Sequence, residues 1–282
     1  MQNPIAVSTW SLHHHLGTSF ANGPGDSAPF KKSDTWGAGG FDILQLPAEL
    51  AARGYFRCEI CHFHLGALDP AYLRGVATAF SAAGVVIQTL LIDDGDLTNP
   101  ATLARDKAWM SSWIEAASVL NAEHVRVIAG KAPPTVASLA LSVEGLREMV
   151  ELGKKLGVKV VTENWHDLLS TPTAVHHVLD HVPGLGFMAD TGNWSGPAKY
   201  DDLASIFSRA QLCHAKAGFA AGLTLDQQDF ARCLDAAQRG RYHGPLTLIF
   251  MDDGDEWRGL AAERSFIAQH APLDATDTGK KH

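Results

Sequence analysis

The fold of this chain is decided by the stretch Lys159-Val160-Val161-Thr162-Glu163-Asn164-Trp165-His166. Its first half is β-favouring and largely apolar, which predicts a buried strand. Its second half brings a carboxylate, an amide, an indole and an imidazole to the end of that strand. A carboxylate directly after a buried run is costly to desolvate unless a metal, a cation or a polar cavity meets it. The stretch therefore predicts a strand that ends in a functional site.

Seven other apolar runs alternate with helix-like segments along the chain. Apolar strands separated by single helices are typical of a parallel sheet that is covered on both faces. Eight such units without a linker favour one closed (β/α)8 TIM barrel, a single domain over residues 1–271. A doubly wound open sheet is the alternative, but Thr9-Trp10-Ser11 stands where its glycine-rich motif is expected. The seven other predicted strands are 5–12, 56–63, 85–92, 124–129, 185–189, 211–215 and 246–251, and the predicted helices are 42–54, 69–84, 99–121, 142–157, 171–182, 200–210, 226–240 and 256–269.

Two segments lie outside this pattern. Residues 13–40 are rich in Gly, Pro, Ser, Asp and His, and the segment is long enough to form a lid over the barrel mouth or a mobile excursion. Its His13-His14-His15 run is expected to be a solvated loop rather than a metal site. Residues 272–282 are expected to form a flexible tail.

Composition narrows the function classes. The chain has 282 residues, of which 46% are hydrophobic, so it can bury a large core. Its net charge of −8 argues against nucleic acid as a partner, because duplex binding needs a basic face. The N-terminus lacks a signal-peptide pattern, and no apolar run reaches membrane-spanning length. We therefore expect a cytoplasmic protein with no membrane partner, and reduced core thiols at Cys58, Cys61, Cys213 and Cys233.

Polar residues gather at the ends of the predicted strands. In a barrel of this kind the strand ends and the loops after them form the site. A scaffold without a site has no reason to concentrate such groups at one end, because each costs desolvation. Trp10, Trp165 and Trp194 could form an apolar wall for a sugar ring or simply pack at the barrel mouth. The polar groups at the strand ends are His62, His64, Asp93, Arg126, Glu163, Asn164, His166, Asp190, Asn193, His214, Lys216 and Asp252 or Asp253.

The sharpest subset is Glu163, Asp190 and His214. Two carboxylates and an imidazole can bind a divalent cation such as Mn²⁺, Mg²⁺ or Zn²⁺ and leave coordination positions open for water or substrate. The alternative is a polar network around a buried Lys216 or Arg126. No phosphate-binding loop is present, and we expect no organic cofactor.

Four strand-end motifs resemble those of the xylose isomerase-like barrels over roughly residues 5–270. That superfamily includes sugar and sugar-phosphate isomerases and epimerases, inosose dehydratases and AP endonucleases. The resemblance implies a metal set of Glu, Asp, His and Glu on strands five to eight. Glu163, Asp190 and His214 match the first three members. The motifs are Thr162-Glu163-Asn164, Asp190-Thr191-Gly192-Asn193, His214-Ala215-Lys216 and Gly244-Pro245-Leu246-Thr247-Leu248.

Two positions depart from the family pattern. Ile249 stands where the fourth ligand, a glutamate, is expected, and Asn193 replaces the histidine of the family's Asp-x-x-His on strand six. In the family's epimerases two glutamates exchange the substrate proton from opposite sides, and that scheme is incomplete here. Asp252 or Asp253, one turn further on, could replace the missing carboxylate.

The resemblance and the residues together predict a sugar or sugar-phosphate isomerase or epimerase that acts on a small sugar or polyol. Glu163, free or metal-bound, is the expected base. A metal, Lys216 or Arg126 would stabilise the enediolate, and His62 or His64 would return the proton. A dehydratase and a metal-free binding relative remain alternatives, and a homodimer is an expected assembly because such barrels often pair through helices. AP-endonuclease activity is less expected because the chain is acidic. The expected substrate-binding residues are Trp10, His64, Arg126, Asn164, His166, Asn193 and Trp194.

Overall fold

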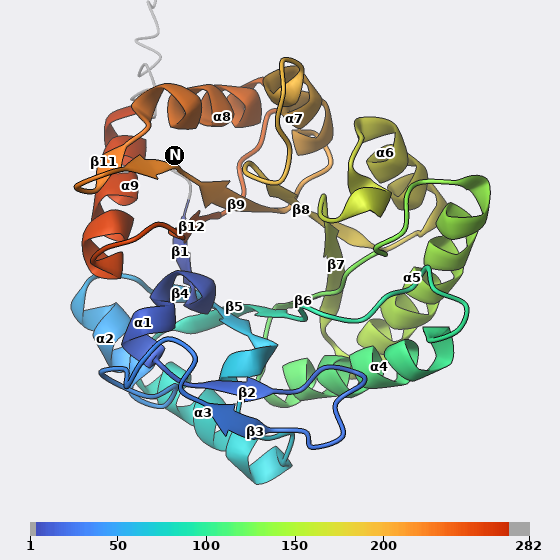
Figure 1. The fold of residues 1–282 in the computed structure, drawn as a ribbon, viewed down its shortest axis with the longest axis horizontal. Coiled ribbons are helices and arrows are strands. Elements are labelled where there is room, and N and C mark those ends of the chain that lie inside the picture. The colour runs from blue at the N-terminus through green and yellow to red at the C-terminus, as the bar shows by residue number, and fades with distance from the viewer. Residues whose placement is uncertain (1–3, 271–282) are drawn as a thin grey trace, which may run out of the picture.

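A computed structural model describes residues 4–270 of the chain. Eight parallel strands close into a barrel in the order β1-β12-β9-β8-β7-β6-β5-β4, and β4 pairs back onto β1 (Figure 1). The TIM barrel predicted from the alternation of apolar runs is therefore confirmed. The predicted tail at 272–282 lies outside the described residues. The barrel strands are β1 (Ile5–Ser8), β4 (Arg57–Cys61), β5 (Val86–Leu91), β6 (His124–Arg126), β7 (Lys159–Glu163), β8 (Gly186–Asp190), β9 (Leu212–Lys216) and β12 (Leu246–Ile249).

Helices surround the barrel, and local sequence signals set their ends. Asp69 caps α3 by accepting the N–H groups of the first turn, and Gly157 ends α5 in a left-handed conformation with φ of 73°. Helix α5 starts six residues before its predicted start, because Thr135 and Ser138 form a reciprocal capping box. The outer helices are α2 (Leu46–Ala52), α3 (Pro70–Ala82), α4 (Leu103–Val119), α5 (Val136–Leu156), α6 (Pro172–His181), α7 (Lys199–Phe207), α8 (Gln227–Arg239) and α9 (Glu256–His270).

A small apolar cluster fills the barrel interior below the strand ends. Successive side chains of a strand point to opposite faces, so residues two apart share a face. Three strands place a functional side chain two positions beyond a member of this cluster, so the packing of the cluster aims the functional side chain into the barrel mouth. The pairs are Val161 and Glu163 on β7, Met188 and Asp190 on β8, and Leu212 and His214 on β9.

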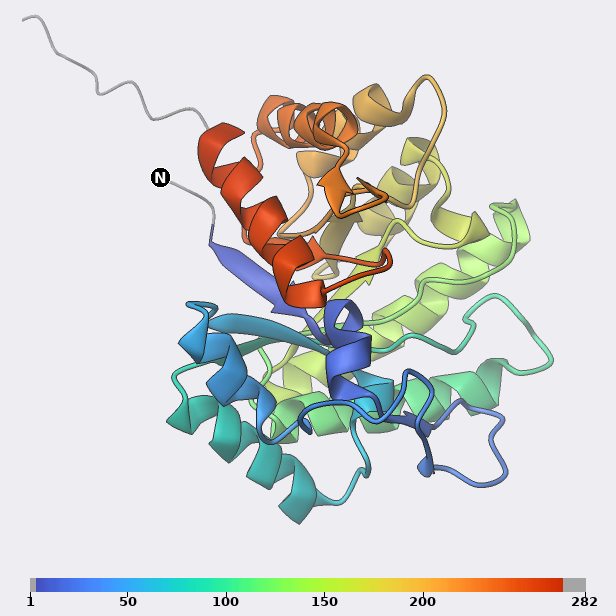
Figure 2. The ribbon, with the colours of Figure 1, turned by 60° about the vertical axis from the view of Figure 1, so that its left-hand side comes forward.

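The segment 13–40 is folded rather than a solvated loop. It contains α1 (His13–Leu16) and a hairpin of β2 (Ser19–Ala21) and β3 (Lys31–Ser33). The Glu256 carboxylate accepts the backbone N–H groups of His14 and His15 at 2.8 and 3.1 Å, which joins α1 to the start of α9 (Figure 2). None of residues 13–40 lines the cavity at the carboxyl ends of the barrel strands, and a lid role for them stays a prediction.

Some smaller features complete the fold. A second hairpin, β10 (Phe219–Ala220) and β11 (Thr224–Leu225), follows β9 and was not predicted. All four cysteines are buried free thiols, as expected. Within residues 4–270, no helix combines the length and the apolar character that crossing a bilayer requires.

One buried carboxyl group stands outside the barrel mouth. Glu263 on α9 has no solvent exposure, and neither of its carboxyl oxygens makes a well-formed hydrogen bond to the described residues. Burial raises the pKa of Glu263 well above its usual range, and the neighbouring Asp252 carboxylate raises this pKa further. The folded protein therefore favours the neutral form of the Glu263 carboxyl group.

This burial makes a prediction about stability. In the unfolded chain Glu263 ionises near its ordinary pKa of 4.5, whereas in the folded chain it keeps its proton to higher pH. The folded state therefore binds more protons, and this group lowers the stability of the wild type as the pH rises above its unfolded pKa. The variant Glu263→Gln has no ionisable group at this position, so its stability does not fall with pH for this reason. Its stability relative to the wild type should rise between pH 4 and pH 8, by up to about 1.4 kcal/mol per pH unit.

Urea unfolding of the two proteins across this pH range measures the difference. The matched control is Glu144→Gln, which alters an exposed glutamate on α5 and should follow the wild-type profile. Parallel profiles for Glu263→Gln and the wild type would show that Glu263 is ionised in the folded protein.

Candidate metal centre and substrate cavity

A cavity of about 160 Å³ opens at the carboxyl ends of the strands. One part of its wall is charged and the other part is apolar. A bound molecule would therefore meet both ionised groups and hydrocarbon. The charged part is formed by Asp93, Arg126, Glu163, Asp190, His214 and Lys216. The apolar part is formed by Trp10, Leu91, Trp165, Ile249 and Met251.

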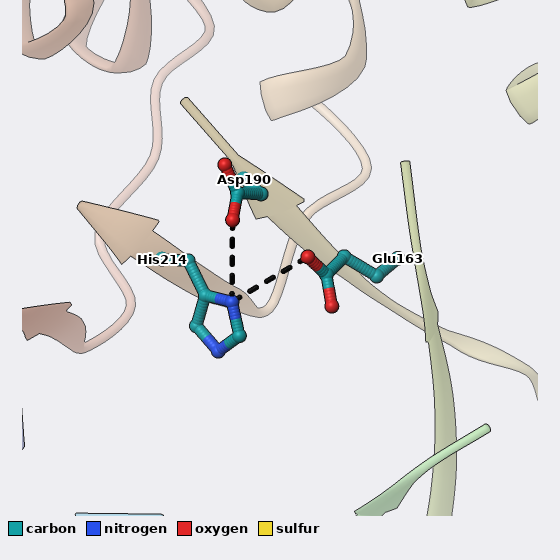
Figure 3. A group of neighbouring side chains, drawn as sticks. All are labelled: Glu163, Asp190 and His214. Carbon is teal, nitrogen blue, oxygen red and sulfur yellow. Dashed lines mark ion pairs between the residues drawn. The ribbon is translucent and has the colours of Figure 1, made fainter. Parts of the chain in front are cut away.

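The charged wall contains a group of side chains that could hold a metal ion. Glu163, Asp190 and His214 end the neighbouring strands β7, β8 and β9, and all three are buried (Figure 3). Their candidate ligand atoms lie within 4.8 Å of one another. His214 Nδ1 is 3.5 Å from Glu163 Oε1 and 3.5 Å from Asp190 Oδ2. The three residues predicted to be metal ligands are thus brought together around one point.

Two asparagines hold these carboxylates in place. Asn164 accepts the backbone N–H of Asp190 at 2.7 Å and donates to the backbone oxygen of Asp190 at 3.0 Å, so it clamps the end of β8. The Asn193 side chain donates to Glu163 Oε1 at 2.9 Å, and its backbone N–H donates to Asp190 Oδ1 at 3.0 Å. Asn193, which replaces the family's histidine, therefore orients both carboxylates.

The second ring nitrogen of His214 meets a carboxylate that the sequence analysis did not single out. His214 Nε2 lies 2.7 Å from Glu59 Oε2, and Glu59 on β4 has no solvent exposure. Burial by itself raises the pKa of Glu59, but the His214 imidazolium beside it outweighs burial and holds this pKa below its usual range. The signal that could have identified Glu59 is a carboxylate inside the apolar run 56–63.

The donor set fits a divalent cation. Burial lowers the pKa of His214, but the charges of Glu59 and Glu163 outweigh burial and raise this pKa well above its usual range. Without a metal the His214 ring therefore carries a second proton at Nδ1, between the carboxylates of Glu163 and Asp190. Glu163 Oε2 is buried without a hydrogen-bond partner among the described residues. Two carboxylates, an imidazole and an unsatisfied oxygen suit a cation with open coordination positions.

Arg126 places a permanent positive charge beside this centre. Its guanidinium donates to the backbone oxygen of Ile92 at 2.8 Å and to the Asp93 carboxylate. Its Nε lies 3.1 Å from Glu163 Oε2 without hydrogen-bond alignment. Burial raises the pKa of Asp93, but the charges and hydrogen bonds of Arg126 and His62 together outweigh burial and lower this pKa to about 2. From the sequence, a metal site at Glu163, Asp190 and His214 and a polar network around Arg126 are alternative predictions. In the structure the two groups of side chains lie next to each other.

Several predicted site residues lie outside the cavity wall. His62 Nδ1 accepts the backbone N–H of Asp93 at 3.2 Å, and His64 Nδ1 lies 2.9 Å from Thr9 Oγ1. His166 stacks on Trp165 with ring centroids 4.2 Å apart, and Trp194 donates to the backbone of Leu169 at 3.1 Å. Their roles in catalysis or substrate binding stay predictions. Trp10, Arg126, Asn193 and Lys216 line the cavity as placed by the sequence analysis, whereas His62, His64, Asn164, His166 and Trp194 do not.

No aspartate takes the place of the missing fourth ligand. Ile249 lines the cavity, is 4% exposed and pairs in register with Lys216 on β9. Asp252 and Asp253 are exposed and do not line the cavity, and Asp252 Oδ2 accepts the backbone N–H of Phe219 at 3.1 Å. The suggestion that either aspartate substitutes for the glutamate is therefore wrong.

Comparisons with known proteins agree with this architecture. Residues 40–269 match the model of the xylose isomerase-like TIM barrel family, and the chain belongs to that family. The structure is similar to an L-ribulose 3-epimerase, with a TM-score of 0.70, 15% identity and coverage of 95% of this chain and 94% of that one. It is also similar to a D-allulose 3-epimerase from Methylomonas sp., with a TM-score of 0.70, 15% identity and coverage of 95% and 98%. A structure of the Methylomonas enzyme in complex with D-allulose has a TM-score of 0.68, 16% identity and coverage of 95% and 97%. No curated protein matches the sequence.

The apolar side chain at position 249 yields a test of the metal centre. Ile249→Glu adds a carboxylate to the cavity wall, and a fourth oxygen ligand should raise Mn²⁺ affinity by about tenfold, which is about 1.4 kcal/mol. Isothermal titration of metal-free protein with Mn²⁺ measures this change. The control Ile249→Gln has the same shape without the charge and should stay within about threefold of the wild type. Equal affinities for all three proteins would show that position 249 does not face the cation.

Proposed function

We propose that the protein is an isomerase of a small sugar or sugar phosphate, and that it moves a proton next to a carbonyl group in the cavity at the barrel mouth. The observation that carries this proposal is the state of Glu163. Its carboxylate is buried on the cavity wall, and Oε2 has no hydrogen-bond partner among residues 4–270. A carboxylate with a free lone pair beside a substrate-sized cavity is suited to act as a general base.

The charges around Glu163 support proton abstraction. Removing a proton beside a carbonyl places negative charge on the substrate oxygens, and fixed cations stabilise that charge. Arg126 and Lys216 both line the cavity, and the Lys216 charge also acts on Asp190. A divalent cation such as Mn²⁺, Mg²⁺ or Zn²⁺, held by Glu163, Asp190 and His214, would polarise the carbonyl group.

The apolar side chain at position 249 favours isomerisation over epimerisation. Inverting one carbon requires a group that takes a proton from one face and another that returns a proton to the opposite face. Ile249 lies three strands around the barrel from Glu163, on β12, and neither Ile249 nor Met251 beside it can donate a proton. One carboxylate can still move a proton between adjacent carbons on the same face, which is the aldose–ketose reaction. The solved relatives named above are epimerases, but at their low identity they support the fold alone.

A dehydratase is the second candidate, because Lys216 is available as an acid. Its ammonium group faces the same cavity as Glu163 and could protonate a leaving hydroxyl group while Glu163 removes the neighbouring proton. The two reactions share the base and differ in the product, because only the dehydratase releases water.

The proposal predicts the behaviour of Glu163→Gln. This change keeps the shape of the side chain and removes the base, so proton abstraction should fall by roughly 10²–10⁴-fold. The assay follows deuterium uptake from D₂O at the carbon beside the carbonyl by NMR, with Mn²⁺ present and a panel of ketoses, aldoses and their phosphates. Retention of the substrate hydroxyl groups in the product distinguishes isomerisation from dehydration.

The control is Glu256→Gln, which alters another buried glutamate that does not line the cavity. Its deuterium exchange should match the wild type, and circular dichroism should show that both variants keep the wild-type fold. Full exchange in Glu163→Gln would exclude Glu163 as the base. A wild type that binds Mn²⁺ weaker than millimolar and shows no exchange would support a metal-free binding protein instead.

A further inference from the structure

A chain of hydrogen bonds links the partly exposed Arg57, at the start of β4, to the candidate metal centre. Arg57 Nε donates to Gln88 Oε1 at 2.8 Å, and Gln88 Nε2 donates to Glu59 Oε1 at 2.9 Å. Glu59 Oε2 then meets His214 Nε2 at 2.7 Å. Gln88 and Glu59 are both fully buried, so water does not compete for these bonds. Thr89 Oγ1 also donates to Glu59 Oε1, at 3.0 Å.

Arg57 at one end of this chain determines which group donates and which accepts in every hydrogen bond of the chain. A guanidinium group can only donate, so the carbonyl oxygen of the Gln88 amide must face Arg57 and its NH₂ group must face Glu59. The Glu59 carboxylate accepts on both sides, so His214 Nε2 must be the donor. An imidazole that binds a cation is neutral and carries one N–H, so in the metal-bound state the lone pair is on Nδ1. Nδ1 is the atom that lies between Glu163 and Asp190.

We propose that Glu59 is a positioning residue of the metal centre, and that the chain from Arg57 through Gln88 to Glu59 fixes the His214 tautomer that presents Nδ1 to a divalent cation. This inference deepens the proposed function and rests on its metal site. Hydrogen-bond partners of a metal-bound imidazole orient the ring and typically change metal affinity by about 10- to 100-fold.

The substitution Glu59→Gln nearly keeps the shape of the side chain but should reverse the direction of its hydrogen bond to His214 Nε2. In Glu59→Gln, the NH₂ group of Gln88 and the hydroxyl of Thr89 retain the oxygen of the new amide on their side. The NH₂ group of the new amide then faces His214 Nε2 and forces that nitrogen to accept. The ring proton moves to Nδ1, where it blocks coordination.

A second substitution should restore the original direction. In the double variant Glu59→Gln/Gln88→Glu, the new carboxylate at position 88 accepts from Arg57 on one oxygen and from the amide NH₂ at position 59 on the other. The amide oxygen at position 59 then faces His214 Nε2 and accepts its N–H. The exchange of acid and amide conserves net charge and nearly conserves volume, so rescue would report hydrogen-bond direction rather than general stability.

The test is Co²⁺ binding by metal-free wild type, Glu59→Gln and the double variant, followed by calorimetry and by the visible absorption of bound Co²⁺. Glu59→Gln should bind Co²⁺ about 10- to 100-fold more weakly, and the double variant should return to within about tenfold of the wild type. Nitrogen NMR of the Zn²⁺-loaded wild type should show the His214 proton on Nε2. Glu256→Gln, which alters the buried glutamate bonded to His15, should bind Co²⁺ like the wild type.

Several results would overturn the inference. These are wild-type affinity in Glu59→Gln, no recovery in a folded double variant, or no Co²⁺ binding by the wild type. If Glu59→Gln does not fold, the double variant alone decides, because it must bind Co²⁺ although position 59 no longer carries a carboxylate. Failure of sugar turnover with this binding pattern intact would remove the proposed reaction and leave the role of Glu59 standing.

Discussion

The site depends on the cost of burying several carboxylates together at one end of the barrel. Each would be expensive to remove from water alone, and the protein offsets this cost with fixed cations and hydrogen bonds. Without a metal, four carboxylates face three cations, one of which is the doubly protonated His214 ring. Exchange of one imidazole proton for a divalent cation would bring the group to neutrality. The carboxylates are Glu59, Asp93, Glu163 and Asp190, and the cations are Arg126, His214 and Lys216.

The same balance explains why the cavity has two kinds of wall. Charged side chains and apolar side chains both line the cavity, and the apolar ones are indoles and aliphatic chains. Ile249 is one of the apolar residues, so it adds no further negative charge to the cavity that Glu163 and Asp190 line. Ile249 in place of a fourth carboxylate limits the negative charge at the site. Arg126 beside Glu163 compensates part of the negative charge that remains.

Much of this arrangement follows from sequence periodicity. In a strand, residues two apart share a face, so an apolar residue that packs inside the barrel also aims the residue two positions later. Val161 and Glu163 follow this rule on β7. Neighbouring strands in the chain are neighbouring strands in the barrel from β7 to β9, so the ligands Glu163, Asp190 and His214 could be grouped from their order alone.

The sequence by itself determined the eight-stranded barrel, the grouping of Glu163, Asp190 and His214, and the apolar residue at position 249, because these depend on local periodicity and on strand order. Only the tertiary structure decided the partner of His214, since Glu59 lies 155 residues away on β4, a strand that does not pair with β9. It also decided that Asp252 turns away to bind the Phe219 N–H. Closure of the barrel sets both, because it brings together side chains from strands that neither follow one another in the chain nor share a hydrogen-bonded edge.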